Sequence, residues 1–177
     1  MNAAERSLPE RLAAGDPHAF AELYDAYVPA IHGWLWARSG RKDLAEDVVQ
    51  AVMLRCVRHR EGLARVRDLR AWLFAVARNE WRRAGGRNRR AKALDGPAAD
   101  ALPARADEPS GGEEMRGLVA RLRPERREVV VLHAWHGLTF TEIGSVLDTS
   151  PNTVASRWRL ALEELGHAWK AGGHGRA

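Results

Sequence analysis

Apolar residues recur at intervals of three and four along successive stretches of the chain, the spacing of helices with one buried face. The longest stretch follows the helix-start signal Asp16-Pro17 and ends at Gly40, with Pro29 as the point where we expect a kink. Its apolar stripe consists of Phe20, Leu23, Tyr24, Tyr27, Ile31 and Leu35. Further helices are predicted for Ser7 to Ala14, for Arg41 to about Val57, and from Leu69 to Trp81, with a loop from His59 to Asp68. The pattern predicts an all-α fold.

The stretch from Leu138 to Leu165 predicts two helices around a tight turn. Thr139 and Glu142 have the spacing of a capping box, so the first helix should begin there. Ser150 and Pro151 supply an N-cap and a first-turn proline, which start a second helix directly after a short turn. This arrangement is a helix-turn-helix.

The outward face of the second helix in this pair is polar. Asn152, Ser156 and Arg159 lie opposite its apolar stripe, and Thr153 and Arg157 lie on the flank. Such side chains can hydrogen-bond base edges in a major groove, and the amides of a helix N-terminus can hold a phosphate. An ordinary amphipathic helix pair inside a bundle is the alternative that this segment alone leaves open.

Residues 91–114 contain three prolines, three glycines and six acidic residues, a composition typical of a flexible linker. We therefore expect two small helical domains. The expected boundaries are a first domain at 1–90, an acidic linker at 91–114, a second domain at 115–170 and a disordered tail at 171–177.

Charge is distributed unevenly along the chain. Its net charge is +5, yet residues 55–90 carry twelve arginines against three acidic residues, an electrostatic footprint suited to phosphate. The predicted helix within this segment carries Arg78, Asn79, Arg82 and Arg83 beside Trp81. Cationic, hydrogen-bonding and stacking groups on one helix are typical of proteins that bind separated DNA strands. We interpret Trp72 as a core residue, whereas Trp81 fits a core role and a stacking role equally well.

The helix predicted from Arg41 to Val57 has a core-facing side that includes Val48, Val52 and Arg55. Its other side presents Glu46, Asp47 and Gln50, which on composition alone is a solvated surface.

Catalytic chemistry and metal binding find little support in the sequence. Cys56 with His59, and His133 with His136, could each supply two metal ligands, but no second pair lies at zinc-site spacing. No phosphate-cradling glycine motif is present. We therefore expect neither enzymatic activity nor a cofactor nor a metal. The absence of a long apolar run or an apolar N-terminus favours a cytoplasmic protein without membrane insertion.

Taken together, the motifs resemble those of bacterial RNA polymerase sigma factors of the extracytoplasmic-function group, in the sigma-70 family. The segments that carry the resemblance follow the order of the family's regions two and four. They are Phe20 to Tyr27, Ala45-Glu-Asp-Val-Val-Gln50, Ala71-Trp-Leu-Phe-Ala-Val-Ala-Arg-Asn79, Leu122-Arg-Pro-Glu-Arg-Arg-Glu-Val129, and Leu138 to Leu165.

The resemblance implies a promoter-specificity subunit with three binding surfaces and an anti-sigma factor as a further partner. The face with Glu46, Asp47 and Gln50 would dock on the clamp helices of the largest polymerase subunit. The loop His59 to Asp68 would help to hold a flipped base of the −10 element. Residues implied at −10 are Arg65, Arg67, Arg78, Asn79, Trp81, Arg82, Arg83 and Arg87, and those at −35 are Asn152, Thr153, Ser156, Arg157 and Arg159.

Two departures limit this transfer. Arg83 stands where the family commonly has Asp, so a base preference at −10 does not carry over. Ala155 and Leu160 stand where many members have basic residues, so −35 recognition would rely on Asn152, Ser156, Arg157 and Arg159. Two other functions stay open at this point: a stand-alone helix-turn-helix regulator, and a protein-interaction module whose basic face meets an acidic partner.

Overall fold

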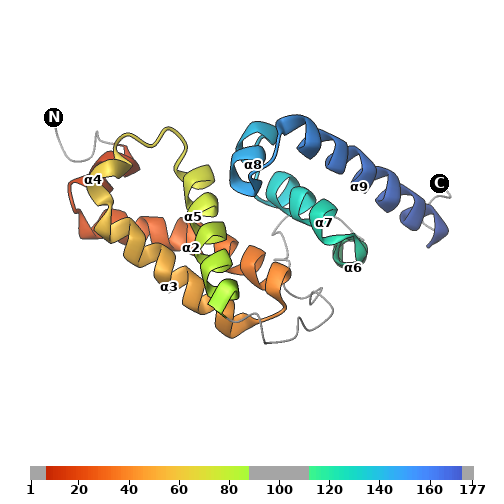
Figure 1. Cartoon of the computed structure of the whole chain (residues 1–177), viewed down its shortest axis with the longest axis horizontal. Helices are drawn as coiled ribbons and strands as arrows, with labels where there is room; N and C mark the ends of the chain where they lie inside the picture. Colours follow the sequence, from red (N-terminus) through yellow and green to blue (C-terminus); the bar gives the residue numbers. More distant parts are fainter. Residues whose placement is uncertain (1–6, 88–111, 173–177) are drawn as a thin grey trace.

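The computed structural model describes residues 7–87 and 112–172, and within these ranges the chain is helical, without β-strands. Two groups of helices lie side by side (Figure 1). The first group, which we call the N-terminal domain, is α1 (Leu8–Ala13), α2 (Pro17–Ser39), α3 (Lys42–Arg58), α4 (Arg60–Leu63) and α5 (Leu69–Arg87). The second, the C-terminal domain, is α6 (Gly112–Arg121), α7 (Pro124–Val130), a π-helical turn η3 (Val131–Trp135), α8 (Phe140–Leu147) and α9 (Pro151–Ala171).

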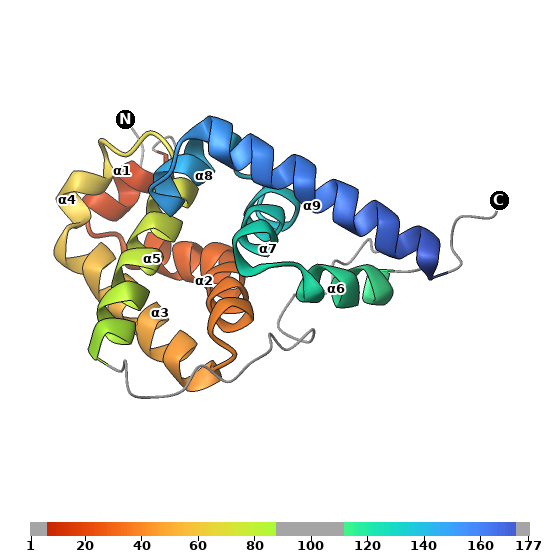
Figure 2. The same cartoon turned by 45° about the vertical axis from the view of Figure 1, so that its right-hand side comes forward.

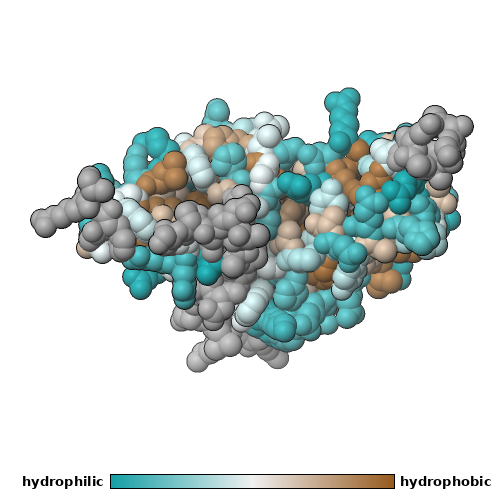
Figure 3. Space-filling view, turned by 180° about the vertical axis from the view of Figure 1, so that it is seen from behind, coloured by the Kyte–Doolittle hydropathy of each residue, from teal (hydrophilic) through white to brown (hydrophobic). Residues whose placement is uncertain are grey.

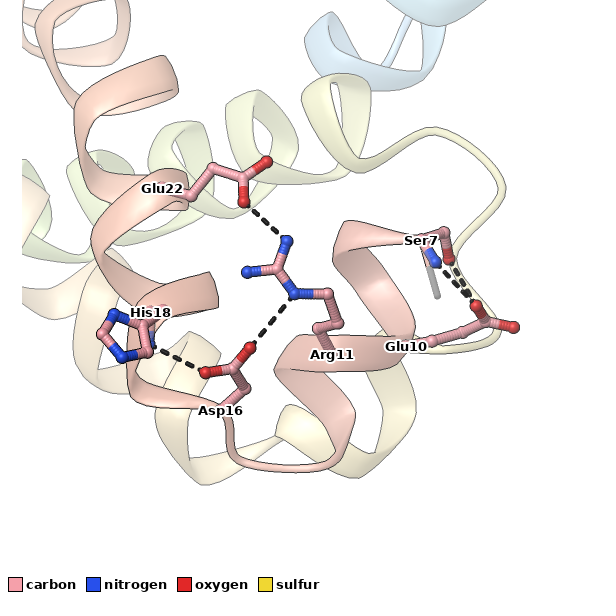
Figure 4. A network of polar contacts seen from close by, with 6 residues as sticks. All are labelled: Ser7, Glu10, Arg11, Asp16, His18 and Glu22. Atoms are coloured by element: carbon pink, nitrogen blue, oxygen red, sulfur yellow. Dashed lines mark hydrogen bonds and ion pairs between the residues drawn. The ribbon is translucent and has the colours of Figure 1, made fainter. Parts of the chain in front are cut away.

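Polar side chains hold α1 against the start of α2 (Figure 4). Ser7 and Glu10 form a capping box on α1, and the Asp16 carboxylate caps α2 by accepting a hydrogen bond from the His18 amide at 2.9 Å. The Arg11 guanidinium then bridges the two helices, with Nε 3.1 Å from Asp16 and Nη1 2.8 Å from Glu22. The hydrogen bond from Arg11 lowers the pKa of Asp16, so the cap stays ionised.

Helices α2, α3 and α5 pack against one another around the core of the N-terminal domain. Helix α2 continues unbroken through Pro29 and ends at Gly40, whose φ of +65° is a left-handed conformation that glycine adopts without strain. The core side chains are Leu23, Ile31, Trp34 and Leu35 from α2, Val48, Val52 and Cys56 from α3, and Leu73, Phe74 and Ala77 from α5. Trp34 meets Phe74 edge-on, with ring centroids 5.4 Å apart.

The helix-turn-helix is formed by α8 and α9, as the sequence predicts. Thr139 and Glu142 form the capping box of α8, and the Ser150 hydroxyl accepts a hydrogen bond from the Thr153 amide at the start of α9. Between them Asp148 adopts φ +54°, and the Thr149 amide bonds to the Gly144 carbonyl at 2.9 Å. The turn passes so close to α8 that a Cβ on Gly144 would lie 2.8 Å from the Thr149 carbonyl oxygen. Only glycine leaves the room that this turn needs.

Several sequence-based expectations need correction. The segment from His59 to Asp68 is not entirely loop, because α4 covers Arg60–Leu63 and buries Leu63 in the core. The expected linker is helical at its end, since α6 begins at Gly112, and the expected tail begins inside α9, which reaches Ala171. The predictions for residues 88–111 and 173–177 lie outside the described residues. Burial of Leu63 in the core accounts for α4. The other two differences are shifts of a few residues at helix ends.

The two domains meet where α5 lies beside α8 and where the end of α2 meets α7 (Figures 1 and 2). We call this contact the interdomain seam. The Arg70 guanidinium donates to the His136 carbonyl at 2.8 Å, and that of Arg78 to the Leu147 carbonyl at 2.6 Å. The His136 ring packs on the Phe74 ring, with centroids 4.9 Å apart. An ion pair between Arg38 of α2 and Glu128 of α7 closes the other end of the seam.

Candidate nucleic-acid and polymerase interfaces

Helix α5 carries the basic surface that the sequence predicts for separated DNA. Asn79, Arg82 and Arg83 are exposed on it, whereas Arg78 and Trp81 are half-buried and turn toward the seam. Arg65 and Arg67 are exposed in the segment between α4 and α5. Arg87 is the last residue of α5. The predicted set is therefore spread over one helix and the segment before it, with two members facing the other domain.

A hollow of about 400 Å³ opens beside Asn79, between α3, α4 and α5. Trp72 lines it, so this residue is not solely a core side chain as the sequence suggests; it is half-buried with its apolar surface against the core. The remaining lining residues are Arg55, His59, Gly62, Leu63, Val66, Ala75 and Val76. An aromatic and apolar wall with a few hydrogen-bonding groups matches the needs of an unstacked base, which offers a flat face and a polar edge.

Arg55 is a candidate site residue that sequence reasoning assigns to the core. Its guanidinium Nη1 donates to Oε1 of Glu80 on α5 at 2.7 Å, and Arg83 Nη1 donates to the same oxygen at 2.9 Å. The Glu80 side chain is only 14% exposed, so the two guanidinium groups offset a carboxylate that would otherwise repel DNA phosphate. An arginine on an apolar helix stripe was the available signal, because charged side chains that become buried are nearly always paired.

Trp81 is packed into the seam. The Arg38 guanidinium lies over its ring, 4.3 Å from the centroid, and the buried indole Nε1 has no hydrogen-bond partner among the described residues. In this structure the Trp81 ring therefore packs within the protein, against Arg38.

The predicted reading face of the helix-turn-helix is open to solvent. Asn152, Ser156 and Arg159 are exposed on the first turns of α9, while Arg157 is half-buried. Thr153 is half-buried and its hydroxyl lies 2.9 Å from that of Ser150, so its role is mainly that of a cap. Arg159 Nη1 lies 3.1 Å from Glu163 Oε1. Because this ion pair is exposed to solvent, it is weak, and a DNA phosphate can take the place of the carboxylate.

A second hollow, of about 800 Å³, lies between α2 and α3 on the face that carries Glu46 and Gln50. Tyr24 (52% exposed), Leu54 (55%) and Val57 (47%) line it, and they are three of the four large apolar side chains that stand exposed among the described residues. The sequence places Tyr24 on the buried stripe of α2, and this placement is wrong. We call this surface the α2–α3 groove. Asp47 is exposed on α3 but does not line the groove.

Apolar residues reach the surface in separate patches on both halves of the molecule, set among hydrophilic side chains (Figure 3). The α2–α3 groove has an apolar floor that includes Tyr24, Leu54 and Val57, and Glu46 and Gln50 form a polar rim. It is therefore a candidate protein-docking surface.

Three of the four Cys and His residues considered as metal ligands pack within the protein. Cys56 is fully buried in the core, and burial raises the pKa of its thiol to about 11. The His133 ring contacts the Leu138 carbonyl at 2.7 Å and packs edge-on against Trp158. Burial lowers the pKa of His136 to about 4, with a smaller contribution from Arg70. No helix within the ranges that the structure describes is long and apolar enough to cross a bilayer.

Comparison with known proteins assigns a family to both domains. Residues 23–91 match the family described as sigma-70 region 2, and residues 112–165 match that described as sigma-70 region 4. RNA polymerase sigma factor CarQ of Myxococcus xanthus is 31% identical, covering 88% of this chain and 92% of its own. ECF RNA polymerase sigma factor SigL of Mycobacterium tuberculosis is 30% identical, covering 87% of this chain and 94% of its own.

A solved structure shares the fold. The sigma factor RpoE of Bartonella quintana, solved with the anti-sigma factor NepR, has a TM-score of 0.65 at 21% identity, covering 85% of this chain and 96% of its own. A match through both domains does not favour a stand-alone helix-turn-helix regulator, which would need only the second. The chain belongs to the extracytoplasmic-function group of the sigma-70 family, the RNA polymerase sigma factors that direct promoter-specific initiation of transcription.

Proposed function

We propose that this sigma factor holds core RNA polymerase at the α2–α3 groove, captures the −10 element as a separated strand on α5, and reads the −35 element as duplex with α9. The hollow beside Asn79 is the observation that carries the proposal. It places an aromatic wall, an amide and a guanidinium beside a helix rich in arginine, and these are the groups that suit an extruded nucleotide.

Polymerase docking rests on the exposed apolar residues of the groove. Tyr24, Leu54 and Val57 lie beside Glu46 and Gln50, so a partner helix could bury apolar area while its polar residues meet the carboxylate and the amide. The clamp helices of the largest polymerase subunit are the partner that we assign to this surface. Asp47, on the adjacent exposed turn of α3, would lie at the rim of the interface.

Leu54→Glu tests this assignment, with Leu162→Glu as a matched control. Both leucines are about half exposed, at 55% and 48%, but Leu162 lies on α9, away from the groove. We expect Leu54→Glu to weaken binding to core polymerase at least about tenfold, because it places an unpaired charge in an apolar contact. Leu162→Glu should leave binding unchanged. Equal binding by both variants would remove the groove from the polymerase interface.

At −10, we assign stacking to Trp72, edge recognition to Asn79 and phosphate contacts to Arg55, Arg82 and Arg83. Arg65, Arg67 and Arg87 would follow the backbone on either side, and Arg78 and Trp81 would join them only when the seam is open. Asn79→Ala should reduce discrimination among bases at the captured position more than overall affinity, since an amide reads an edge. Single-stranded oligonucleotides that vary at one position measure this.

At −35, we assign base contacts to Asn152, Ser156 and Arg159, whose side chains stand exposed at the start of α9. Arg157 and the α9 N-terminus would position a phosphate, and Thr153 supports them as part of the cap. Asn152→Ala should change which base is preferred in duplex binding, whereas Arg157→Ala should weaken binding to all sequences alike.

Runoff transcription with purified core polymerase tests the function as a whole. We expect the chain to confer initiation at defined start sites on genomic DNA, and core enzyme alone to give none. No new start site in its presence would overturn the proposal. If the chain were instead a stand-alone helix-turn-helix regulator, it would bind its operator tightly without polymerase. Leu54→Glu would then leave its activity unchanged.

We further infer that the chain acts in the bacterial cytoplasm, where polymerase and promoters are, and that it works by binding alone, without catalysing a reaction. An anti-sigma factor is the additional partner that we propose, because the related fold in Bartonella quintana was solved with one bound. An inhibitor that covers the α2–α3 groove would exclude polymerase. Competition between such an inhibitor and core enzyme for the chain tests this.

A further inference from the structure

Glu80 is the only acidic residue of α5, a helix that carries five arginines and that we assign to the −10 strand. It follows Asn79 directly in the chain. A carboxylate at this position repels DNA phosphate, so it lowers the affinity for every strand unless it also supplies something that recognition requires.

One oxygen of Glu80 holds a guanidinium group from each of two helices. Oε1 accepts hydrogen bonds from Nη1 of Arg55 on α3 at 2.7 Å and from Nη1 of Arg83 on α5 at 2.9 Å. The Glu80 side chain is 14% exposed, while those of Arg55 and Arg83 are 37% and 59% exposed. Arg55 lines the hollow beside Asn79 and Glu80 does not, so Glu80 reaches a captured nucleotide through Arg55 and not by direct contact.

We propose that Glu80 is a positioning residue for base discrimination at −10: it fixes Arg55, Arg55 fixes the backbone of the captured nucleotide, and the base then meets Asn79 in one register. This inference rests on the proposed −10 role of α5. Phosphate contacts set the register of a strand, and base contacts read its sequence. A guanidinium held in one place binds a phosphate in one place, whereas a free one follows the phosphate and lets several registers form. Asn79 can favour one base only when the same edge faces it each time.

The carboxylate is well suited to hold Arg55. Hydrogen bonds between ionised groups are stronger than neutral ones, and salt weakens a pair that is largely shielded from water less than an exposed pair. By contrast, the ion pair of Arg159 and Glu163 on α9 has side chains that are 68% and 53% exposed, and it is of the ordinary weak kind. The Arg55–Glu80 pair also links α3 to α5 at the hollow.

Two effects of Glu80 on DNA binding are separable. As a negative charge it repels every strand alike, so its removal should strengthen binding to all sequences. As a positioning residue it restricts the register, so its removal should lower the ratio between the affinity for the preferred base and the affinity for the other three. The ratio is therefore the quantity that tests the proposal.

Glu80→Gln in the full chain is the first test, with Asp25→Asn as the control. Both changes remove one negative charge, but Asp25 is exposed on α2 and does not line the hollow. Selection from a single-stranded DNA pool of random sequence by the parent chain identifies the captured position and its preferred base, and labelled oligonucleotides that differ at that position then give the affinity ratio. We expect Glu80→Gln to lower the ratio about threefold or more, a part of the discrimination that one good base contact supplies, and Asp25→Asn to leave it unchanged.

The same substitution in an Arg55→Ala background shows whether Glu80 acts through Arg55. We expect Arg55→Ala itself to lower the ratio and Glu80→Gln to lower it no further, because both changes remove the same contact. A Glu80→Gln effect that is equally large in both backgrounds overturns the proposal and assigns Glu80 a role in the structure of α5 instead.

Glu80→Asp provides a second variant, because it keeps the charge and shortens the side chain by one methylene. It should lower the ratio without strengthening binding to all strands. Circular dichroism checks that each variant is folded, and Glu80→Asp decides the outcome if Glu80→Gln is not. A ratio equal to that of the parent in every folded Glu80 variant overturns the positioning role and leaves the proposed −10 role intact. A parent chain that shows no base preference in single strands sinks the −10 role itself, and this inference with it.

Discussion

Arg55 on α3 donates a hydrogen bond to the Glu80 carboxylate on α5 at 2.7 Å, although 25 residues separate them in the chain. This pair joins two of the three elements around the hollow beside Asn79, and it holds a guanidinium at the rim. A fixed guanidinium loses less conformational entropy on binding a phosphate than a mobile one does.

Arg55→Ala should therefore lower the affinity for single-stranded DNA by about threefold to tenfold, the loss expected for one phosphate contact. The dependence of affinity on salt should also become shallower, because fewer counterions are released. Arg58→Ala is the matched control, since Arg58 is exposed near the end of the same helix but does not line the hollow. Anisotropy titrations at several salt concentrations measure both quantities. Equal losses in the two variants would assign Arg55 a general electrostatic role.

Gly144→Ala should destabilise the helix-turn-helix by about 2 kcal/mol, because the new Cβ would lie 2.8 Å from a backbone oxygen that cannot move independently. Gly166→Ala provides the comparison, because a Cβ added to Gly166 on α9 would meet no atom within 4 Å and alanine favours a helix by about 1 kcal/mol. Urea unfolding followed by circular dichroism gives both values. A neutral Gly144→Ala would show that the turn tolerates displacement.

Acidification should weaken the packing around His136. Burial lowers its pKa to about 4, below the value of about 6.5 for an exposed imidazole, so the unfolded or opened chain binds the proton more readily. Stability is therefore full above pH 6.5 and falls as the pH drops toward 4, with a loss of about 1 kcal/mol expected at pH 5.5. Thermal unfolding between pH 7.5 and 5.5 measures the slope. His136→Gln should flatten the slope, and His167→Gln, at an exposed position, should not.

The thiol of Cys56 should be nearly inert in the folded protein. It is fully buried, and the rise of its pKa to about 11 leaves almost no thiolate at pH 8. A thiol reagent should react with it at the rate at which the N-terminal domain opens, and denaturant should restore fast labelling. Rapid labelling without denaturant would show that the core between α2, α3 and α5 opens readily.

Much of the candidate site is readable from local sequence. Arg82, Arg83 and Asn79 are exposed on α5 because their helical positions lie opposite the apolar stripe, and the α9 reading face follows from the same geometry. That reasoning misplaces Arg55 and Tyr24, and it does not show that Trp72, which packs against the core, also lines the hollow beside Asn79. Whether a residue on an apolar stripe is buried depends on where the neighbouring helix ends, and the spacing within one helix does not carry that information.

The sequence by itself determined the long helices and the caps of the helix-turn-helix, because capping boxes, first-turn prolines and apolar periodicity act over only a few residues. The order of the two sigma regions was implied by the resemblance of the motifs to that family. Only the tertiary structure decided that α4 closes one side of a hollow, that Tyr24 and Leu54 floor an exposed groove, and that Arg78 bonds to Leu147. Those facts join residues as many as 69 positions apart, and such contacts depend on which helix faces pair after each helix has formed.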